Sequence, residues 1–112
     1  MLFSSNMNHK NPKISVLIPA YNEKDTILEI IKQVKAVPLK KEIIVIDDFS
    51  NDGTREILRK IKDPEVRVLF HEKNYGKGRA IRRGMESATG DIVLIQDADL
   101  EYDPNEFTNL IV

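Results

Sequence analysis

The sequence lacks cysteine, so it holds no disulfide framework and no thiolate metal site. This is typical of a reducing compartment, and we expect a cytoplasmic protein. Long hydrophobic runs are also missing, because none approaches the roughly 18 apolar residues that a helix needs to cross a bilayer. The apolar stretch within residues 1–13 is too short for a signal peptide, and we expect these residues to form a flexible leader.

An excess of charge of either sign is absent as well. The 17 Lys and Arg residues and 18 Asp and Glu residues give a net charge of -1. Such a chain has no global positive field, so we expect no nucleic-acid partner, and any anion site must be local. At 112 residues, with 41% hydrophobic and 31% charged residues, the composition is that of one soluble globular domain.

Four short apolar runs recur at regular intervals along the chain: ISVLI (14–18), EIIVI (42–46), VRVLF (66–70) and DIVLI (91–95). They are rich in Ile and Val, and three are nearly continuous rather than alternating. This pattern is typical of strands that are buried on both faces of a parallel sheet.

Helical periodicity fills the intervals between these runs. It predicts helices over residues 25–37, with Asp25 as the N-cap, over 54–62 and over 78–88. Alternating strands and helices indicate an α/β fold, a doubly wound and mostly parallel sheet with helices on both faces. The pattern of another helix begins at Pro104 and is cut short, so we interpret the chain as an incomplete domain.

Polar, acidic and glycine-rich segments follow all four predicted strands: PAYNE (19–23), DDFSNDGT (47–54), HEKNYGKGRA (71–80) and QDADLEYDP (96–104). In open parallel sheets, ligands bind beyond the carboxyl ends of the strands. We therefore expect the four segments to converge on one ligand site.

A family resemblance rests on four motifs: SVLIPAYNE, EIIVIDDFSNDGT, NYGKGRAIRRG and IQDADLEYDP. In this order and at these intervals, they resemble the N-terminal, nucleotide-binding half of the family 2 inverting glycosyltransferases. The closest subgroup is the polyprenol-phosphate sugar transferases, such as dolichyl-phosphate mannose synthase. The resemblance covers nearly everything from Ile14 to Phe107. It implies a GT-A, Rossmann-like fold and a nucleotide-sugar-binding role for residues 14–112.

The acidic motif is a D-x-D formed by Asp97 and Asp99 and continued by Glu101. Hard carboxylate oxygens suit Mg²⁺ or Mn²⁺ and leave positions open for phosphate oxygens. The resemblance implies that all three residues bind this metal and that Asp97 and Asp99 are catalytic. On the residues alone, a solvated acidic turn that leads into a helix, with Asp103 as its N-cap, is an equal alternative.

The resemblance also implies which residues line the donor site. Pro19, Tyr21 and Glu23 would surround the base and ribose, since a nucleoside needs a flat apolar contact and acceptors for its N–H and hydroxyl groups. Ala20 and Ala98, which neighbour these motif residues, are also expected to contact the substrate.

The second segment supplies an acidic residue against the nucleobase in this family. Both Asp47 and Asp48 are candidates, and we favour Asp48. Asp52 and Gly53 are expected to form the turn that starts the second helix. The family commonly has Gly where this chain has Phe49, a departure that touches no proposed ligand.

The third segment combines glycines, a helix N-terminus and basic residues, which suits a diphosphate. Lys77 and Arg79 are the candidates for that contact, whereas Arg82 and Arg83 are expected on the solvated face of the helix. Two small residues of the same helix are expected to be close-packing positions: Ala80 and Gly84.

The resemblance implies an enzyme that moves a hexose from a UDP- or GDP-linked donor, with inversion, to a polyprenyl phosphate. Membrane contact, at the cytoplasmic face, would come through a C-terminal part beyond Val112. His71 is expected to be structural rather than a general base. Two alternatives stay open: a nucleotide-binding fragment without turnover, and a phospho-acceptor receiver-like domain built on IIVIDD and Asp97. The glycine motifs of dinucleotide-binding and P-loop proteins are missing.

Overall fold

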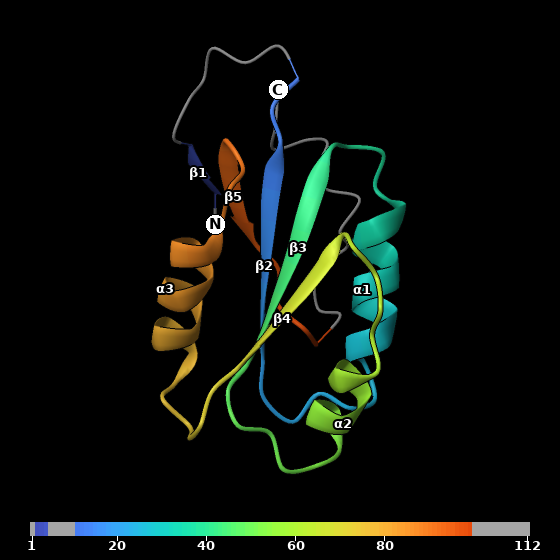
Figure 1. The fold of residues 1–112 in the computed structure, drawn as a ribbon, viewed down its shortest axis with the longest axis vertical. Coiled ribbons are helices and arrows are strands. Elements are labelled where there is room, and N and C mark those ends of the chain that lie inside the picture. The colour runs from blue at the N-terminus through green and yellow to red at the C-terminus, as the bar shows by residue number, and fades with distance from the viewer. Residues whose placement is uncertain (1, 5–10, 100–112) are drawn as a thin grey trace.

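The computed structural model of the chain describes residues 2–4 and 11–99 and shows a sheet with helices on both faces (Figure 1). The strands are β1 (Leu2–Ser4), β2 (Ile14–Ala20), β3 (Lys41–Asp47), β4 (Val66–Phe70) and β5 (Ile92–Ile95). The helices are α1 (Ile27–Ala36), α2 (Thr54–Arg59) and α3 (Lys77–Ser87). Each predicted strand and each predicted helix within these residues is present.

The five strands form one sheet in the order β1-β5-β2-β3-β4. β5, β2, β3 and β4 run parallel to one another, and β1 pairs with β5 in the antiparallel direction. The expected mostly parallel, doubly wound sheet is therefore confirmed. The carboxyl ends of the parallel strands all point to the lower end of the molecule in Figure 1.

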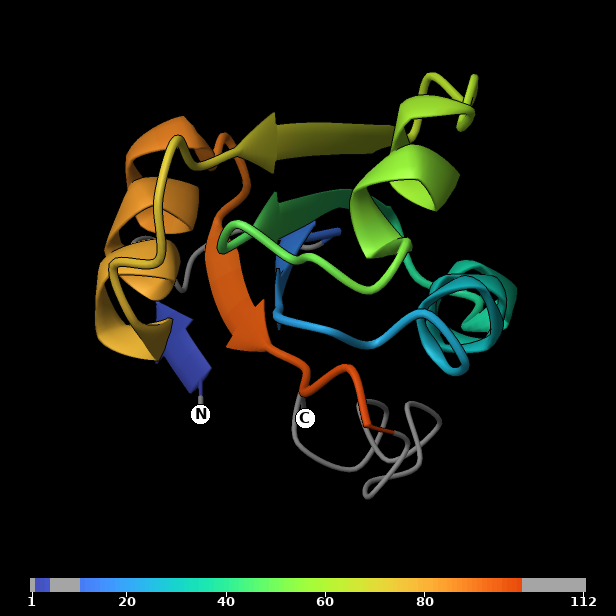
Figure 2. The same ribbon diagram turned by 90° about the horizontal axis from the view of Figure 1, so that it is seen from below.

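Strand alternation divides the core into two layers. Leu17, Ile44 and Ile46 are fully buried beneath α3, in one cluster with Ala80 of that helix. Their neighbours Val16 and Ile18, with the rest of the larger cluster, lie on the other face beneath α1 and α2. Successive side chains of a strand point to opposite faces, so a continuous apolar run can supply both layers. Figure 2 shows α3 on one side of the sheet and the other two helices on the opposite side.

Close approach of α3 to the sheet depends on small residues, as expected from the sequence. A Cβ atom added at Gly84 would lie 2.8 Å from Ile46 Cδ1 and 3.1 Å from Leu17 Cδ1. Ala80, one turn earlier, is completely buried. The interpretation of both residues as close-packing positions is confirmed.

The start of α1 differs from the expectation. The N-cap is Thr26 rather than Asp25, and the helix spans Ile27–Ala36 instead of residues 25–37. Before the first helical turn, the amides of Thr26 and Ile27 both donate to the carbonyl of Glu23, at 3.2 and 2.9 Å. This turn fixes the entry of the chain, so Asp25 is left outside the helix.

Two further differences concern strands. Residues 1–13 were expected to form a flexible leader, but Leu2–Ser4 within them forms an edge strand that pairs with β5. No pattern in the sequence predicted this strand. β2 also continues through Pro19 and Ala20, two residues that were expected in the loop. Proline fits there because β5 pairs with β2 only as far as Leu17, so Pro19 has a strand on one side alone. The helix expected from Pro104 lies outside the described residues.

Candidate functional site

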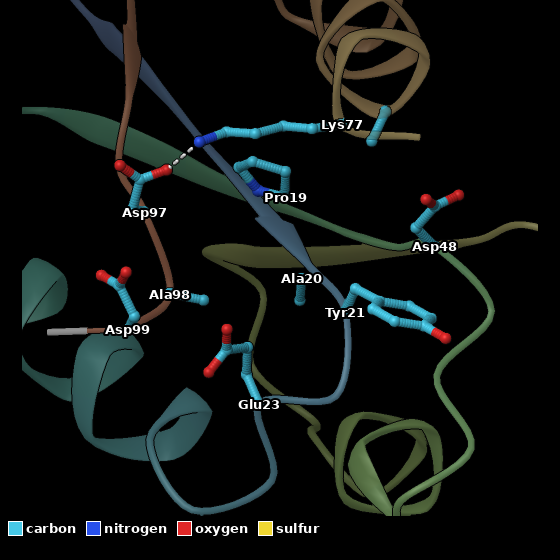
Figure 3. Close-up of a pocket in the computed structure, with 10 residues that line it drawn as sticks. Pro19, Ala20, Tyr21, Glu23, Asp48, Lys77, Asp97, Ala98 and Asp99 are labelled. Carbon is cyan, nitrogen blue, oxygen red and sulfur yellow. Dashed lines mark hydrogen bonds and ion pairs between the residues drawn. The ribbon is translucent and has the colours of Figure 1, made fainter. Parts of the chain in front are cut away.

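A pocket of about 180 Å³ opens at the carboxyl ends of the parallel strands. Figure 3 shows residues from all four expected segments around it. Asp97 and Asp99 lie on one side of the pocket, Tyr21 and Asp48 lie on the opposite side, and Glu23 lies between the two groups. The full lining is Pro19, Ala20, Tyr21, Glu23, Asp48, Lys77, Ala80, Asp97, Ala98 and Asp99. The convergence expected from the sheet topology is confirmed.

The first segment lines the base of the pocket and is fixed by the second segment. The Asn22 amide donates to the Ser50 hydroxyl at 2.9 Å, and the Asn51 amide donates to the side chain of Asn22 at 2.8 Å. The amide of Glu23 donates to the Thr54 hydroxyl at 3.0 Å, at the start of α2. These bonds hold the backbone beside the Tyr21 ring, whose exposed fraction is 45%. A half-exposed aromatic ring on a fixed backbone is suited to a flat ligand.

The adjacent carboxylates Asp47 and Asp48 point to different places. Asp47 is completely buried and forms an ion pair with Arg55 at 2.9 Å, and it does not line the pocket. Its second oxygen, Oδ1, has no partner among the described residues. Arg55 also donates to the carbonyl of His71 at 2.9 Å. Asp47 therefore joins the second and third segments as part of the scaffold, and only Asp48 reaches the pocket.

Asp48 connects the pocket wall to the third segment. Its carboxylate accepts hydrogen bonds from Nδ1 of His71 at 2.8 Å and from the amides of Tyr75 and Gly76 at 2.9 and 2.8 Å. Burial would raise the pKa of Asp48, but these three hydrogen bonds outweigh it and hold the pKa below its usual value. Asp48 thus stays ionised, and the expected structural role of His71 is borne out by its burial and by this bond.

Phe49, directly after Asp48, occupies the left-handed region with a φ of 66°. This conformation is strained for a bulky residue and free for glycine, which gives a physical reason for the Gly that the resemblance implies at this position. The ring of Phe49 lies 5.4 Å from the guanidinium of Arg55, a cation–π contact that offsets part of the strain.

Lys77 and Asp97 close the pocket on the side of α3. The Lys77 ammonium lies 2.5 Å from Oδ1 of Asp97, and both side chains are partly exposed. The contact joins the start of α3 to the segment after β5, as the dashed line in Figure 3 shows. On the other side, the hydroxyl of Thr26 donates to the carbonyl of Ala98 at 2.6 Å. The segment that carries Asp97 and Asp99 is therefore held from both α1 and α3.

Two of the expected site residues, Asp47 and Arg79, do not line this pocket, and a third lies outside the described residues. Arg79 lines a different cavity beside His71, Tyr75 and Arg82. Glu101 belongs to the stretch that the structure does not describe. Within residues 2–4 and 11–99, no three His, Cys, Asp or Glu side chains are grouped so that they could hold a metal ion. Of the three residues that the resemblance implies as metal ligands, Asp97 and Asp99 lie within the described residues and both line the pocket.

Sequence reasoning assigned Ala80 to packing alone, although it also lines the pocket. It also missed the positioning contacts of Asn22, Ser50 and Thr26, because hydrogen bonds between loops leave no periodic signal. The signal available for Ala80 was its place on the same helical face as Lys77, three residues earlier.

Residues 15–111 match the sequence profile of Glycosyl transferase family 2. The chain belongs to this family. This membership supports the resemblance seen in the four motifs and leaves the receiver-domain alternative without support. In the part of this chain that the structure describes, no helix is long and apolar enough to cross a membrane.

Curated relatives of this family 2 chain are polyprenyl-phosphate sugar transferases. The chain is 36% identical over 106 residues to the undecaprenyl-phosphate 4-deoxy-4-formamido-L-arabinose transferase of Proteus mirabilis, covering 88% of this chain and 32% of that protein. It is 39% identical over 114 residues to the protein of the same name from Aeromonas hydrophila, covering 94% of this chain and 35% of that protein. The chain spans about a third of the length of the relatives it matches.

Solved structures of glycosyltransferases share the fold of this family 2 chain. The mannosyltransferase PcManGT from Pyrobaculum calidifontis, in complex with GDP-Man and Mn²⁺, superposes with a TM-score of 0.78 at 28% identity, over 88% of this chain and 30% of that one. Glucosyl-3-phosphoglycerate synthase from Mycobacterium tuberculosis, in complex with Mn²⁺, UDP and glucosyl-3-phosphoglycerate, superposes with a TM-score of 0.70 at 31% identity, over 88% and 37% of the two chains. The expected GT-A fold is confirmed.

Proposed function

We propose that this chain is the donor-binding part of a glycosyltransferase that moves a hexose, with inversion, from a nucleoside-diphosphate sugar to a polyprenyl phosphate. The relatives named for transfer to undecaprenyl phosphate support the acceptor class. The neighbours solved with GDP-Man and with UDP support the donor class. By the same relationship, we propose that the intact protein works at the cytoplasmic face of a membrane.

The division of the pocket into two sides is the observation that carries this proposal. The ring of Tyr21 and the carboxylate of Asp48 lie on one side, and Asp97 and Asp99 lie on the other. A nucleoside diphosphate has the same division, because its base and ribose need a flat contact and acceptors while its diphosphate needs cations. In this pose the nucleoside lies against Tyr21, with Glu23 positioned near the ribose.

The chemistry of Asp97 and Asp99 fits a divalent metal. Magnesium is commonly held by one or two carboxylates together with substrate phosphate oxygens, and manganese accepts the same hard ligands. Mn²⁺ in two of the structural neighbours supports this class of ion. When bound, the ion supplies a Lewis acid that offsets negative charge on the departing diphosphate. Either Mg²⁺ or Mn²⁺ suits the two carboxylates.

Lys77 has a separate role in this proposal. Its ammonium lies between α3 and Asp97, on the side of the pocket assigned to the diphosphate. A bound diphosphate would offer this ammonium a second anion, so Lys77 would orient the leaving group. The acceptor needs no general base in the described chain, because a phosphate monoester with a second pKa of about 6 is already anionic near neutral pH.

The volume of the pocket limits what the described residues can hold. About 180 Å³ is less than the roughly 300 Å³ at which ligand pockets usually begin. The described residues would thus form the nucleotide wall of the site, while further walls around the sugar and acceptor come from other residues. Binding of nucleotide by this chain and turnover by the intact protein are therefore separate questions.

The proposal is tested by titrating UDP and GDP, each with and without Mn²⁺, into the chain and into Asp99→Asn by calorimetry. We expect UDP or GDP to bind only when the metal is present. The variant should lose at least about tenfold in nucleotide affinity, because even residues that only support the metal ligands contribute that much. Asp25→Asn is the matched control, because Asp25 is exposed, lies near the start of α1 and does not line the pocket.

Two results would contradict the assignment in different ways. Equal binding by Asp99→Asn and the unaltered chain would remove Asp99 from the metal site while leaving the nucleotide pocket in place. No binding of either nucleotide, with metal present and a folded chain, would reject the pocket as a donor site.

A further inference from the structure

A second cavity lies beside the donor pocket and shares no lining residue with it. Its volume is about 320 Å³, and its lining comes from the loop that follows β4 and from α3. In Figure 1 this loop runs from the lower end of β4 to the lower end of α3. The lining residues are His71, Tyr75, Arg79, Arg82, Arg83 and Glu86. We call this the arginine cavity.

The arginine cavity concentrates positive charge in a chain whose net charge is -1. Arg79, Arg82, Arg83 and Glu86 are spaced i, i+3, i+4 and i+7, so they lie along one face of α3. Like charges at this spacing destabilise a helix, and Glu86 is the one acid among the described residues of the lining. Within the described residues, none of the three arginines forms an ion pair, whereas Arg55, Arg59 and Arg67 all do. Among the described residues that line the cavity, three arginines thus stand against one carboxylate.

Two of the three guanidinium groups are held in place. Arg83 donates to the carbonyl of Phe70 at 2.9 Å and is only partly exposed. Arg79 stacks on the ring of Tyr75 at 5.0 Å, and this ring meets the buried His71 edge-on at 5.1 Å. Arginines on a purely solvated face would extend into water without such supports. The arrangement is that of donors positioned before a ligand arrives.

We propose that the arginine cavity is a second anion site, which binds a phosphate group either free in solution or on a lipid headgroup. Guanidinium groups present paired N–H donors that match phosphate oxygens, and they remain charged at any pH relevant to proteins. The cavity lies within the volume range of small-molecule sites, so a phosphate and the group that carries it both fit. This site goes beyond the donor pocket and does not depend on the proposed transfer reaction.

The test uses the 112-residue chain labelled with ¹⁵N, and inorganic phosphate is the first probe. The variant is the double substitution Arg79→Ser and Arg82→Ser, which spares Arg83 because its bond to Phe70 supports the fold. Arg59→Ser is the matched control, since it removes an exposed arginine of α2 that does not line the cavity. Amide spectra of each variant report whether it is folded before any titration.

We expect phosphate to bind saturably and to shift amides of residues 71–76 and of α3. The double variant should lose about tenfold in affinity, as expected when two charge-assisted contacts to phosphate are removed. The control should keep its affinity within about twofold, because loss of one distant charge changes only the general field.

A second arm separates the two sources of phosphate. The chain is sedimented with vesicles of phosphatidylcholine alone and with vesicles that also contain phosphatidic acid. Binding to the phosphatidic acid vesicles that is lost in the double variant assigns the cavity to a lipid headgroup, even if free phosphate binds weakly. Saturable binding of phosphate without vesicle binding assigns it to a soluble ligand.

Three outcomes would overturn the proposal. The first is a folded chain that binds neither probe. The second is an equal loss in Arg59→Ser and in the double variant, which would reduce the effect to net charge. The third is displacement of phosphate by UDP or GDP in proportion to nucleotide binding, which would place the phosphate in the donor pocket.

Discussion

Single residues of the same type take different roles according to what surrounds them. Asp47 and Asp48 are adjacent and both buried, yet Asp47 faces Arg55 inside the scaffold while Asp48 lines the pocket. The sequence favoured Asp48 without deciding, because strand alternation shows only that the two side chains point to opposite sides. The choice between them comes from partners more than twenty residues away from Asp48, at His71, Tyr75 and Gly76.

Replacing Asp48 by Asn should therefore affect both stability and the third segment. The amide keeps the shape but has one oxygen acceptor in place of two, so at least one of the three bonds to His71, Tyr75 and Gly76 is lost. We expect a loss of about 1–3 kcal/mol in the free energy of unfolding at pH 7. Urea denaturation measures this loss, and hydrogen exchange should show faster exchange at the amides of Tyr75 and Gly76.

The stability lost in Asp48→Asn should depend on pH. Because the pKa of Asp48 is lowered in the folded state, its contribution is present above the unfolded value and disappears as the pH falls through the folded value. The difference between Asp48→Asn and the unaltered chain should therefore shrink in acid. Unchanged exchange at Tyr75 and Gly76 in the variant would show that Asp48 does not hold the third segment.

At the scale of elements, the contacts of α3 with the sheet depend on what each glycine touches. A Cβ atom at Gly84 would meet only the flexible ends of Ile46 and Leu17. A Cβ atom at Gly90, in the turn between α3 and β5, would meet backbone: the carbonyl oxygen of Lys13 at 2.7 Å and the amide nitrogen of Ser15 at 2.8 Å. Side-chain ends can move by small rotations, whereas the β2 backbone is fixed by strands on both sides.

We therefore expect Gly90→Ala to be more destabilising than Gly84→Ala. Overpacking against backbone should cost about 1–3 kcal/mol at Gly90. At Gly84 the smaller strain against movable side-chain ends is offset by the gain in helix propensity, about 1 kcal/mol, so a change within about 1 kcal/mol is expected. Urea denaturation of both variants measures the order, and a reversed order would mean that the side-chain ends beneath Gly84 cannot move aside, or that the turn at Gly90 lies farther from Lys13 and Ser15 than the structure shows.

How far the sequence predicted these elements depends on the kind of signal each one has. β2 and β3 were found because they are buried on both faces and read as continuous apolar runs. β4 and β5 are less buried and were found by their short runs rich in Val, Ile and Leu. β1 was missed because three residues carry no period. Lys77 and Arg79, both expected at the diphosphate, line different cavities, since residues two apart on a helix do not face the same way. Helical phase alone could have separated them, whereas bonds between loops needed the structure.

At the scale of the whole molecule, the candidate site and a charged network occupy opposite ends of the sheet. The site lies at the carboxyl ends of the strands, and the network surrounds Glu42 near their amino ends. The Glu42 carboxylate accepts from the hydroxyl of Ser15 at 2.5 Å and from the amide of Thr89 at 2.6 Å, and it pairs with Arg67 at 3.0 Å. These contacts join β2, β4 and the turn before β5 to β3. The stabilising contacts of Glu42 and the proposed nucleotide pocket thus lie at opposite ends of the sheet.

Glu42→Gln should consequently lower stability without changing nucleotide binding. Burial would raise the pKa of Glu42, but the hydrogen bonds from Ser15 and Thr89 and the charge of Lys13 hold it below its usual value. The folded state then binds the proton less tightly than the unfolded chain does, so the carboxylate stabilises the fold above the unfolded pKa of about 4.3. This contribution is lost as the pH falls through the lower, folded value.

We expect Glu42→Gln to lose about 1–3 kcal/mol at pH 7, the usual cost of removing hydrogen bonds to a partly buried charged group, and less in acid. Urea denaturation across the acid range measures this, with Glu56→Gln as the control because that exposed side chain forms a 4.0 Å ion pair with Arg59 on the surface of α2. Nucleotide affinity in the presence of Mn²⁺ should stay unchanged in both variants while the chain is folded. A loss of nucleotide affinity in folded Glu42→Gln would show that the two ends of the sheet are coupled, contrary to their separation in the structure.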